Sequence, residues 1–256
     1  MYAPAAPPLF LADSRRLAYG AGSKTPFSPE GGSLRIRPRL LDLCCGAGGA
    51  AMGYHRAGFD VIGVDIKPQP NYPFEFVVCD ALAYLGLPHI TETFDAIHAS
   101  PPCQTFTAYR RKGHGVGDGY ADLIAETRQL LWSAGLPWVI ENVEGAPLRS
   151  PLMLCGSMFD LDVQRHRYFE SDWPIDDPVW PCRHEIWAPR FPAATNRKPN
   201  SRRTVEVGVW RIPLDVQQRA MGIDWMTGEE LSQAIPPAYT ELIGAQLLAH
   251  LEARAA

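Results

Sequence analysis

Residues 40–49 of this 256-residue chain read LLDLCCGAGG, an apolar run that ends in a cluster of glycines. A short apolar run bounded in this way is typical of a buried strand, and the glycines predict a tight turn directly after it. Residues 50–56 then have the character of a helix, which Gly58 ends. The segment therefore predicts the strand, turn and helix with which a parallel α/β sheet begins.

Four further apolar runs follow this first one, at residues 61–65, 74–80, 94–99 and 138–141. Residues 122–134, before the last of these runs, have helical spacing. Apolar strands that alternate with helices favour a parallel sheet with right-handed crossovers. We therefore predict an α/β fold with a doubly wound, Rossmann-like and mostly parallel sheet.

The composition of the chain changes in two places. Residues 1–36 are rich in Pro, Ala, Gly and Ser without a sustained period, which predicts a flexible N-terminal tail. Residues 171–210 are rich in Pro, Trp and Arg and interrupt the alternation, which predicts a small irregular insert. Residues 37–170 and 211–256 then form one main domain.

The overall composition is that of an ordinary globular protein, with 46% hydrophobic and 20% charged residues. No apolar run approaches the roughly 20 residues that span a bilayer, and the N-terminus lacks the charged-then-apolar order of a signal peptide. The six cysteines are scattered, unlike those of a secreted disulfide framework. We expect a reduced, cytoplasmic protein with no membrane partner.

Basic residues gather in two segments although the net charge is −4. Residues 183–203 contain six Lys or Arg and one acidic residue, Glu185, and residues 110–112 read RRK. Two basic patches on a mildly acidic protein favour a localised site for a polyanion. For either patch alone, solvated surface charge is an equally good interpretation.

Acidic residues end two successive predicted strands. Asp65 ends the second strand, 19 residues after Gly46, and Asp80 ends the third. A carboxylate at the end of the second strand is placed to accept hydrogen bonds from ribose hydroxyls, while one at the third suits an adenine amino group. No Gly-Lys-Ser/Thr follows the glycine turn, so a nucleoside triphosphate is not expected. The pattern predicts a nucleoside cofactor.

Residues 100–104, SPPCQ, hold Cys103 on a proline-fixed turn after the fourth predicted strand. Open α/β sheets place their chemistry at such strand ends, and a thiolate is a strong nucleophile near neutral pH. Glu141 ends the fifth strand at the same edge, while Arg165 and Arg167 alternate along a predicted strand and so share a face. Alone, the motif is more typical of a buried structural cysteine, but together these residues favour a nucleophile.

Taken in their order along the chain, the segments described above resemble the motifs of the DNA cytosine-5 methyltransferases of prokaryotic or phage type. The matching stretches, from motif I to motif X, are 42–49 (I), Asp65 (II), Asp80 (III), 100–104 (IV), 141–143 (VI), 165–169 (VIII), 219–222 (IX) and 234–244 (X). The resemblance covers about residues 38–252, apart from the insert at 171–210, which occupies the place of the target-recognition region. Cys44 stands where the family commonly has an aromatic residue.

The resemblance implies transfer of a methyl group from S-adenosylmethionine to carbon 5 of a cytosine that is flipped out of double-stranded DNA. Cys103 would add to carbon 6, Glu141 would hold N3 and the exocyclic amine, and Arg165 would bind the O2 carbonyl. Arg167 belongs to the same catalytic set. Loss of the carbon-5 proton would then release Cys103.

The remaining site residues are also implied by the resemblance. The cofactor-binding residues would be Asp42, Cys44, Gly46, Gly48, Asp65, Ile66, Asp80, Ala81, Pro101, Gln233, Ala234 and Ile235. The substrate-binding residues would be Gln104, Arg110, Arg111, Asn142, Arg197 and Arg202. Cys155, Cys182 and His184 could serve as zinc ligands, but no fourth partner stands at a convincing spacing, so no metal is predicted. We expect a monomer.

Two alternative functions remain open. The first is the same chemistry on RNA or on a free nucleotide, which the short insert and the mildly acidic overall charge leave open. The second is a catalytically silent DNA-binding or decoy protein. The joint presence of Cys103, Glu141 and Arg165 argues against the second alternative, because a decoy has no physical need for all three.

Overall fold

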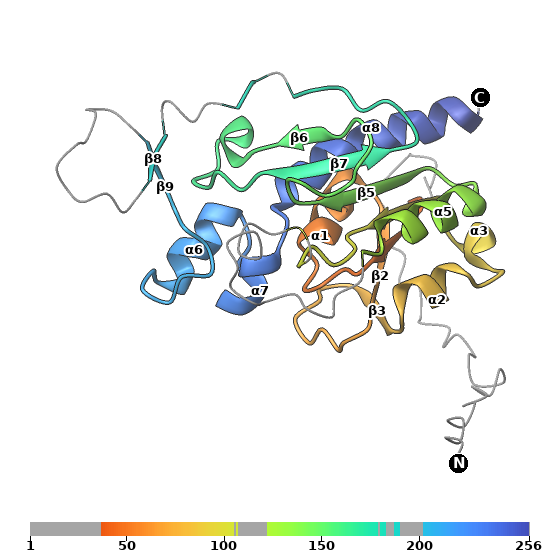
Figure 1. Ribbon diagram of the computed structural model, residues 1–256, viewed down its shortest axis with the longest axis horizontal. Coiled ribbons are helices and arrows are strands. Elements are labelled where there is room, and N and C mark those ends of the chain that lie inside the picture. The colour runs from red at the N-terminus through yellow and green to blue at the C-terminus, as the bar shows by residue number, and fades with distance from the viewer. Residues whose placement is uncertain are drawn as a thin grey trace, which may run out of the picture. The chain divides into compact units, whose positions relative to one another are not determined.

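The computed structural model describes residues 37–104, 106, 122–178, 180–182, 187–189 and 202–255, with only the backbone described at 187–189 and 202–203. The predicted tail, residues 1–36, lies outside these residues, as does most of the segment 183–201. In chain order (Figure 1), the elements are β1 (Arg39–Leu43), α1 (Gly49–Ala57), β2 (Asp60–Asp65), β3 (Glu75–Val78), α2 (Ala81–Leu85), α3 (Ile90–Thr93), β4 (Ala96–Ala99), α5 (Ile124–Ala134), β5 (Trp138–Asn142), β6 (Leu152–Leu154), the 3-10 helix η1 (Gly156–Phe159), β7 (Arg167–Ser171), β8 (Trp187–Pro189), β9 (Arg202–Thr204), α6 (Leu214–Met221), α7 (Gly228–Gln233) and α8 (Pro237–Ala255).

A seven-stranded sheet in the order β3-β2-β1-β4-β5-β7-β6 forms the centre of the fold. The first five strands of this order are parallel, while β7 runs antiparallel to both β5 and β6. The predicted α/β fold with a doubly wound, mostly parallel sheet is confirmed. The predicted strand at 165–169 begins two residues later, at Arg167.

Helices cover both faces of this sheet, so the central strands β1, β4 and β5 are almost entirely buried. One apolar cluster joins one face to α1 and α8 through residues such as Tyr54, Tyr239 and Ile243. A second cluster joins the other face to α2, α3 and α5. This double cover explains why the strands appear in the sequence as continuous apolar runs instead of alternating ones. None of the described helices is both long and apolar enough to cross a membrane.

Helices α1 and α8 pack closely because small residues line their contact. A side chain on Gly53 would collide with the Pro237 carbonyl oxygen and the Thr240 hydroxyl, each 2.1 Å from the position of a Cβ atom. The Thr240 hydroxyl donates a hydrogen bond of 2.8 Å to the Ala50 carbonyl. The C-terminal helix is thereby held against the helix that follows the glycine turn, and its first residues lie near that turn.

A buried ion pair joins α5 to β7. Arg128 donates from Nε and Nη2 to the two carboxylate oxygens of Glu170, at 2.6 and 2.7 Å. The Arg149 backbone N–H donates to the same carboxylate, and Arg128 also donates to the Pro147 carbonyl. Both charged groups are therefore satisfied although their side chains are only 8% and 4% exposed.

Replacing Arg128 is expected to destabilise the fold strongly. The substitution Arg128→Ala would leave the Glu170 carboxylate buried without its cation, which costs on the order of 3–5 kcal/mol. Urea unfolding measures the change, with Arg219→Ala as the control, because Arg219 forms an exposed helical pair with Asp215 that is worth less than about 1 kcal/mol. Equal effects of the two substitutions would contradict the assignment of Arg128 as a structural cation.

Candidate active site

The C-terminal ends of the parallel strands bring the predicted site residues to one edge of the sheet. Asp42 and His98 face each other in the register of β1 and β4, and β5 continues that edge with Glu141 and Asn142. Cys103 follows β4 on the turn that starts at Ser100. Because ligands bind at this edge in open α/β sheets, the topology assigns the candidate site to it.

Asp42 is the least satisfied polar group of this edge. Its side chain is fully buried; the Tyr72 hydroxyl lies near enough to favour its carboxylate form, but no hydrogen bond of regular geometry reaches either oxygen from the described residues. Burial, followed by the nearby charges of Asp65 and Glu141, raises the pKa of Asp42 well above its ordinary value. A buried carboxylate whose hydrogen bonds are incomplete is costly, so it fits a site that is completed by a cationic or hydrogen-bond-donating ligand.

The glycine turn beside Asp42 leaves its backbone accessible. Gly46 has a φ of 50°, and no atom lies within 4 Å of the position that a Cβ would occupy. Gly48 also has a left-handed conformation, with a φ of 83°, and its Cβ position is 2.9 Å from Pro73. Both positions favour glycine because both have a left-handed backbone conformation, and Gly48 also has no space for a side chain. At Gly46 the turn leaves room for a ligand.

Two acidic residues flank this turn, as predicted from the sequence. Asp65 accepts hydrogen bonds from the backbone N–H groups of Gly46 (3.1 Å) and Lys67 (3.0 Å). Asp80 caps α2 by accepting from the Ala83 N–H at 2.9 Å, so the predicted Ala81 is the first residue of that helix. Ile66, directly after Asp65, is 67% exposed and presents an apolar surface beside a carboxylate.

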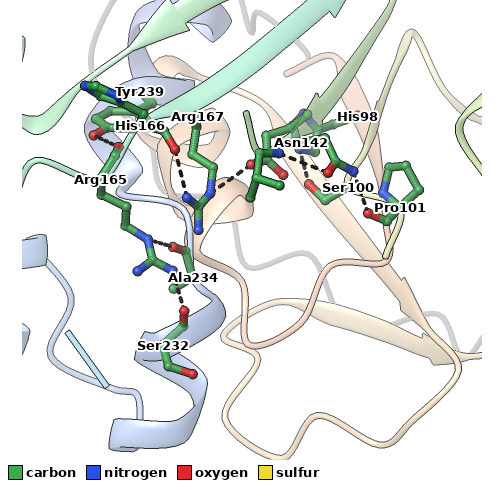
Figure 2. Close-up of polar contacts among 12 residues, drawn as sticks. His98, Ser100, Pro101, Asn142, Arg165, His166, Arg167, Ser232, Ala234 and Tyr239 are labelled. Carbon is green, nitrogen blue, oxygen red and sulfur yellow. Dashed lines mark hydrogen bonds and ion pairs between the residues drawn. The ribbon is translucent and has the colours of Figure 1, made fainter. Parts of the chain in front are cut away.

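The segment 232–235 connects the glycine turn to the predicted catalytic arginines. A Cβ atom on Gly49 would lie 2.4 Å from the Ile235 carbonyl oxygen, so this segment touches the start of α1. Arg165 donates to the carbonyls of Ala234 (2.7 Å) and Ser232 (2.6 Å), as Figure 2 shows. Gln233 is exposed, whereas Ala234 and Ile235 are buried. The segment 232–235 therefore contains predicted cofactor-binding residues and also binds Arg165, a predicted catalytic residue.

Cys103 is held in place by a hydrogen bond from the neighbouring strand. Asn142 donates from Nδ2 to the Pro101 carbonyl at 2.9 Å, and its own Oδ1 accepts from the Val143 N–H. Asn142 is 1% exposed, and its hydrogen bond to Pro101 fixes the Pro-Pro-Cys turn; its contact with substrate stays a prediction. Cys103 and Gln104 are both half-buried.

Glu141 forms an ion pair with the second arginine of the Arg-His-Arg stretch, not the first. Arg167 Nε lies 3.0 Å from Glu141 Oε1, and the side chains are 13% and 8% exposed. Burial raises the pKa of Glu141, while Arg167, a hydrogen bond from Ser100 and Arg165 oppose that rise. Burial and the adjacent Arg167 lower the pKa of Arg165 to about 9, which leaves it cationic at neutral pH.

A buried chain of hydrogen bonds supports Glu141 from behind. Tyr54 Oη lies 3.0 Å from His98 Nδ1, and His98 Nε2 lies 2.9 Å from Ser100 Oγ. Burial lowers the pKa of His98 to about 3, so its imidazole is neutral and has one donor and one acceptor nitrogen. If Ser100 donates to the Glu141 carboxylate, Nε2 must donate to Ser100 and Nδ1 must accept from Tyr54.

This relay was not anticipated from the sequence. A histidine within an apolar strand is most simply interpreted as a core residue, and His98 is indeed fully buried. The signal that could have identified it is its spacing, because His98 and Ser100 alternate along the strand that leads into the Pro-Pro-Cys turn. Of the predicted substrate-binding residues, Arg110, Arg111 and Arg197 lie outside the described residues, and only the backbone of Arg202 is described.

The electrostatics of the site make a prediction about thiol reactivity. Burial and the Glu141 charge raise the pKa of the Cys103 thiol, and Arg167 and Arg165 partly offset them. We expect its alkylation by iodoacetamide to accelerate with pH through a midpoint above that of an ordinary thiol. Glu141→Gln should lower that midpoint, because it removes a negative charge that disfavours the thiolate.

Mass spectrometry of the Cys103 peptide after timed alkylation measures this midpoint, and the peptide that contains the half-buried Cys79 serves as an internal reference. A midpoint that stays unchanged or rises in Glu141→Gln would show that the carboxylate does not act on the thiol.

Comparison with protein families gives a match to the C-5 cytosine-specific DNA methylase family over residues 38–147. Two curated relatives, the Type II methyltransferases M.HgiDI and M.HgiGI of Herpetosiphon aurantiacus, are each 28% identical to this chain over 43% of its length. The matches cover 38% of M.HgiDI and 94% of M.HgiGI. The matched segment of the family includes the glycine turn, Cys103 and Glu141.

Solved structures resemble the chain over a longer range. A protein from an E. coli prophage, described as a candidate DNA modification methyltransferase, superposes with a TM-score of 0.57, covering 84% of this chain and 99% of its own at 16% identity. The Dnmt2 methyltransferase of S. pombe superposes with a TM-score of 0.53 over the same shares of each chain, at 14% identity. At these identities the likeness shows the fold.

Proposed function

We propose that this chain, whose residues 38–147 match the C-5 cytosine-specific DNA methylase family, is a member of that family and methylates carbon 5 of cytosine in DNA with S-adenosylmethionine as the methyl donor. The observation that carries the proposal is one sheet edge on which Cys103 and the Glu141–Arg167 pair lie beside the glycine turn. A nucleophile, a buried carboxyl group that can donate a proton and two cationic guanidinium groups suit addition to a pyrimidine ring.

The residues of the glycine turn fit this cofactor. Asp42 is a buried carboxylate that, apart from the nearby Tyr72 hydroxyl, has no hydrogen bond of regular geometry in the described part of the chain, and the backbone at Gly46 borders open space. When bound, S-adenosylmethionine supplies an electrophilic methyl group and carries positive charge that suits this acidic edge. We assign Asp65 to the ribose hydroxyls, Ile66 to a face of the adenine and Asp80 to its amino group.

The protein's own residues would carry the addition to the base. The Cys103 sulfur forms a bond to carbon 6 of cytosine, which moves electron density to carbon 5 and makes that carbon nucleophilic. Glu141, whose pKa is raised by burial, donates a hydrogen bond to N3 and so favours the charge that develops on the ring. After methyl transfer, carbon 5 loses its proton to solvent water, the electron pair restores the double bond between carbons 5 and 6, and Cys103 leaves carbon 6 as a thiolate.

Arg165 and Arg167 would have different roles. Arg167 holds Glu141 in position through the ion pair. Arg165 uses two of its five N–H donors on the carbonyls of the segment 232–235, and we assign its remaining donors to the O2 carbonyl of cytosine.

The target base must leave the helical stack to reach Cys103. Unstacking and unpairing one base costs on the order of a few kcal/mol, which contacts between the protein and the DNA can offset. We propose that residues 171–210 make such contacts with the DNA that surrounds the target.

The acceptor is tested by incubating the protein with labelled S-adenosylmethionine and, separately, duplex DNA of mixed sequence, RNA and free cytosine nucleotides. Nucleoside analysis of the products should find label in 5-methyldeoxycytidine from DNA. Label in RNA or in the free nucleotide alone would favour the first alternative function. No label in any acceptor, with retained DNA binding, would favour the catalytically silent protein.

A further inference from the structure

Cys155, His166 and Cys182 converge close to the catalytic arginines, although 11 and 16 residues separate them along the chain. One potential ligand atom from each residue lies within 4.8 Å of the other two. The sulfur of Cys182 is 3.6 Å from Nε2 of His166. Cys155 is buried and the other two are half-buried. The three residues offer two sulfur donors and one nitrogen donor to a shared point.

These distances match a zinc site. Zinc binds sulfur at about 2.3 Å and imidazole nitrogen at about 2.0–2.1 Å with tetrahedral angles, which places sulfur and nitrogen ligands about 3.6 Å apart. The separation of Cys182 and His166 equals that edge. The other distances between the potential ligand atoms are at most 4.8 Å. Side-chain shifts of about 1 Å would shorten them to the distance between two ligands of a tetrahedral zinc ion.

A second layer of polar groups surrounds the two sulfurs. The Ser157 hydroxyl is placed to donate to Cys155 Sγ (3.2 Å) and to Cys182 Sγ (3.8 Å). The Cys155 thiol donates to the Gln164 carbonyl oxygen at 3.0 Å, a hydrogen bond that the thiol would give up on binding a metal as a thiolate. A hydroxyl directed at two sulfurs is typical of the outer shell that orients thiolate ligands of a metal.

We propose that Cys155, His166 and Cys182 bind one Zn²⁺ ion, with a fourth ligand from outside these three residues. Soft sulfur donors combined with an imidazole select zinc over magnesium or calcium, which prefer oxygen ligands. The imidazole beside the two sulfurs favours a metal over a simple disulfide, which would use no nitrogen donor. The site rests on donor geometry and does not require the proposed methyl transfer.

The ion would position the catalytic arginines. His166 lies between Arg165 and Arg167, so a metal on the imidazole fixes the backbone that presents both guanidinium groups. This backbone is also held by Tyr239, whose hydroxyl donates to the Arg165 carbonyl at 2.7 Å. Cys182 follows β7 and lies within the insert 171–210, so the same ion would tie the insert to the strand that carries the arginines.

Metal content tests the proposal directly. The full-length protein, expressed with zinc and purified under reducing conditions, is expected to retain about one zinc ion per chain by mass spectrometry. Cys182→Ala and His166→Gln, at half-buried positions, should each lower that content at least about fivefold, and Cys155→Ser should do the same. Cys79→Ser, at a half-buried cysteine that the cluster does not include, should keep the zinc of the parent protein.

Cobalt substitution gives a readout that depends on the ligands and not on activity. The cobalt form should show intense visible bands of tetrahedral geometry and a thiolate-to-cobalt charge-transfer band, which weakens in Cys182→Ala. Circular dichroism identifies any variant that fails to fold. If Cys155→Ser does not fold, the zinc content of Cys182→Ala and His166→Gln tests the proposal. Zinc at the parental level in both of these variants, no zinc in the parent, or a Cys155–Cys182 disulfide in the reduced preparation would each overturn the proposal.

Discussion

Cys103→Ser is expected to lower methyl transfer to cytosine by at least about 10³-fold, because a hydroxyl is a far weaker nucleophile than a thiolate near neutral pH. The structure indicates that the substitution affects the nucleophile and not the turn that holds it. Residue 103 sits on a turn that Asn142 holds through the Pro101 carbonyl, so the replacement removes the nucleophile and leaves this hydrogen bond intact. Initial rates with labelled S-adenosylmethionine and duplex DNA measure the loss.

A covalent adduct separates this role from a structural one. DNA that contains 5-fluorocytosine should form a denaturation-resistant complex with the parent protein, because the fluorine cannot leave as the proton does. The complex should be absent in Cys103→Ser and present in the matched control Cys79→Ser. Methyl transfer by Cys103→Ser within about tenfold of the parent rate would refute the nucleophile.

Glu141→Gln is the second change with a large expected effect, a loss of about 10²–10⁴-fold in methyl transfer. The substitution keeps the shape of the side chain but removes the titrating proton and the anionic partner of Arg167. Glu144→Gln, three residues later in an exposed turn, provides the control and should leave the rate unchanged.

The two assays of Glu141→Gln should move in opposite directions. Its Cys103 thiol should alkylate faster at a given pH, because the opposing charge is gone, whereas methyl transfer should slow. This combination distinguishes a carboxyl group that acts on the base from one that merely lowers the reactivity of the thiol. A parallel loss of alkylation and of methyl transfer would indicate instead that the site had collapsed.

The hydrogen-bond relay behind Glu141 also has consequences for these experiments. The chain from Tyr54 through His98 to Ser100 is buried, and it offers the carboxylate one donor in addition to Arg167. When Ser100 donates to it, Glu141 is oriented by two contacts, one from Ser100 and one from Arg167. A carboxyl group restrained in this way loses little rotamer freedom when a base binds, which is the physical advantage of a preorganised site.

Much of the fold could be predicted because its signals are local. The apolar runs between Leu40 and Glu141 are typical of strands that are covered on both faces. Their alternation with helices predicts the mostly parallel sheet, which is confirmed. Strand-end residues such as Asp65 and Cys103 then lie at one edge of the sheet, since parallel strands all end on the same side. Their catalytic and binding roles stay predictions.

The pairings within the site depend on the packing of segments that are distant in the chain. Arg165 contacts the carbonyls of residues almost 70 positions later, and Arg167 is the partner of Glu141 although the sequence makes the two arginines equivalent. The antiparallel insertion of β7 between β5 and β6 produces this difference.

The alternation of residues along the chain thus establishes which strands form and which side chains end together. It contains no information on which donor meets which acceptor, because a hydrogen bond depends on distances of a few tenths of an ångström between segments that only the folded core brings together. His166 shows the difference most clearly: its neighbours in the sequence are two arginines, and its neighbours in space are two cysteines.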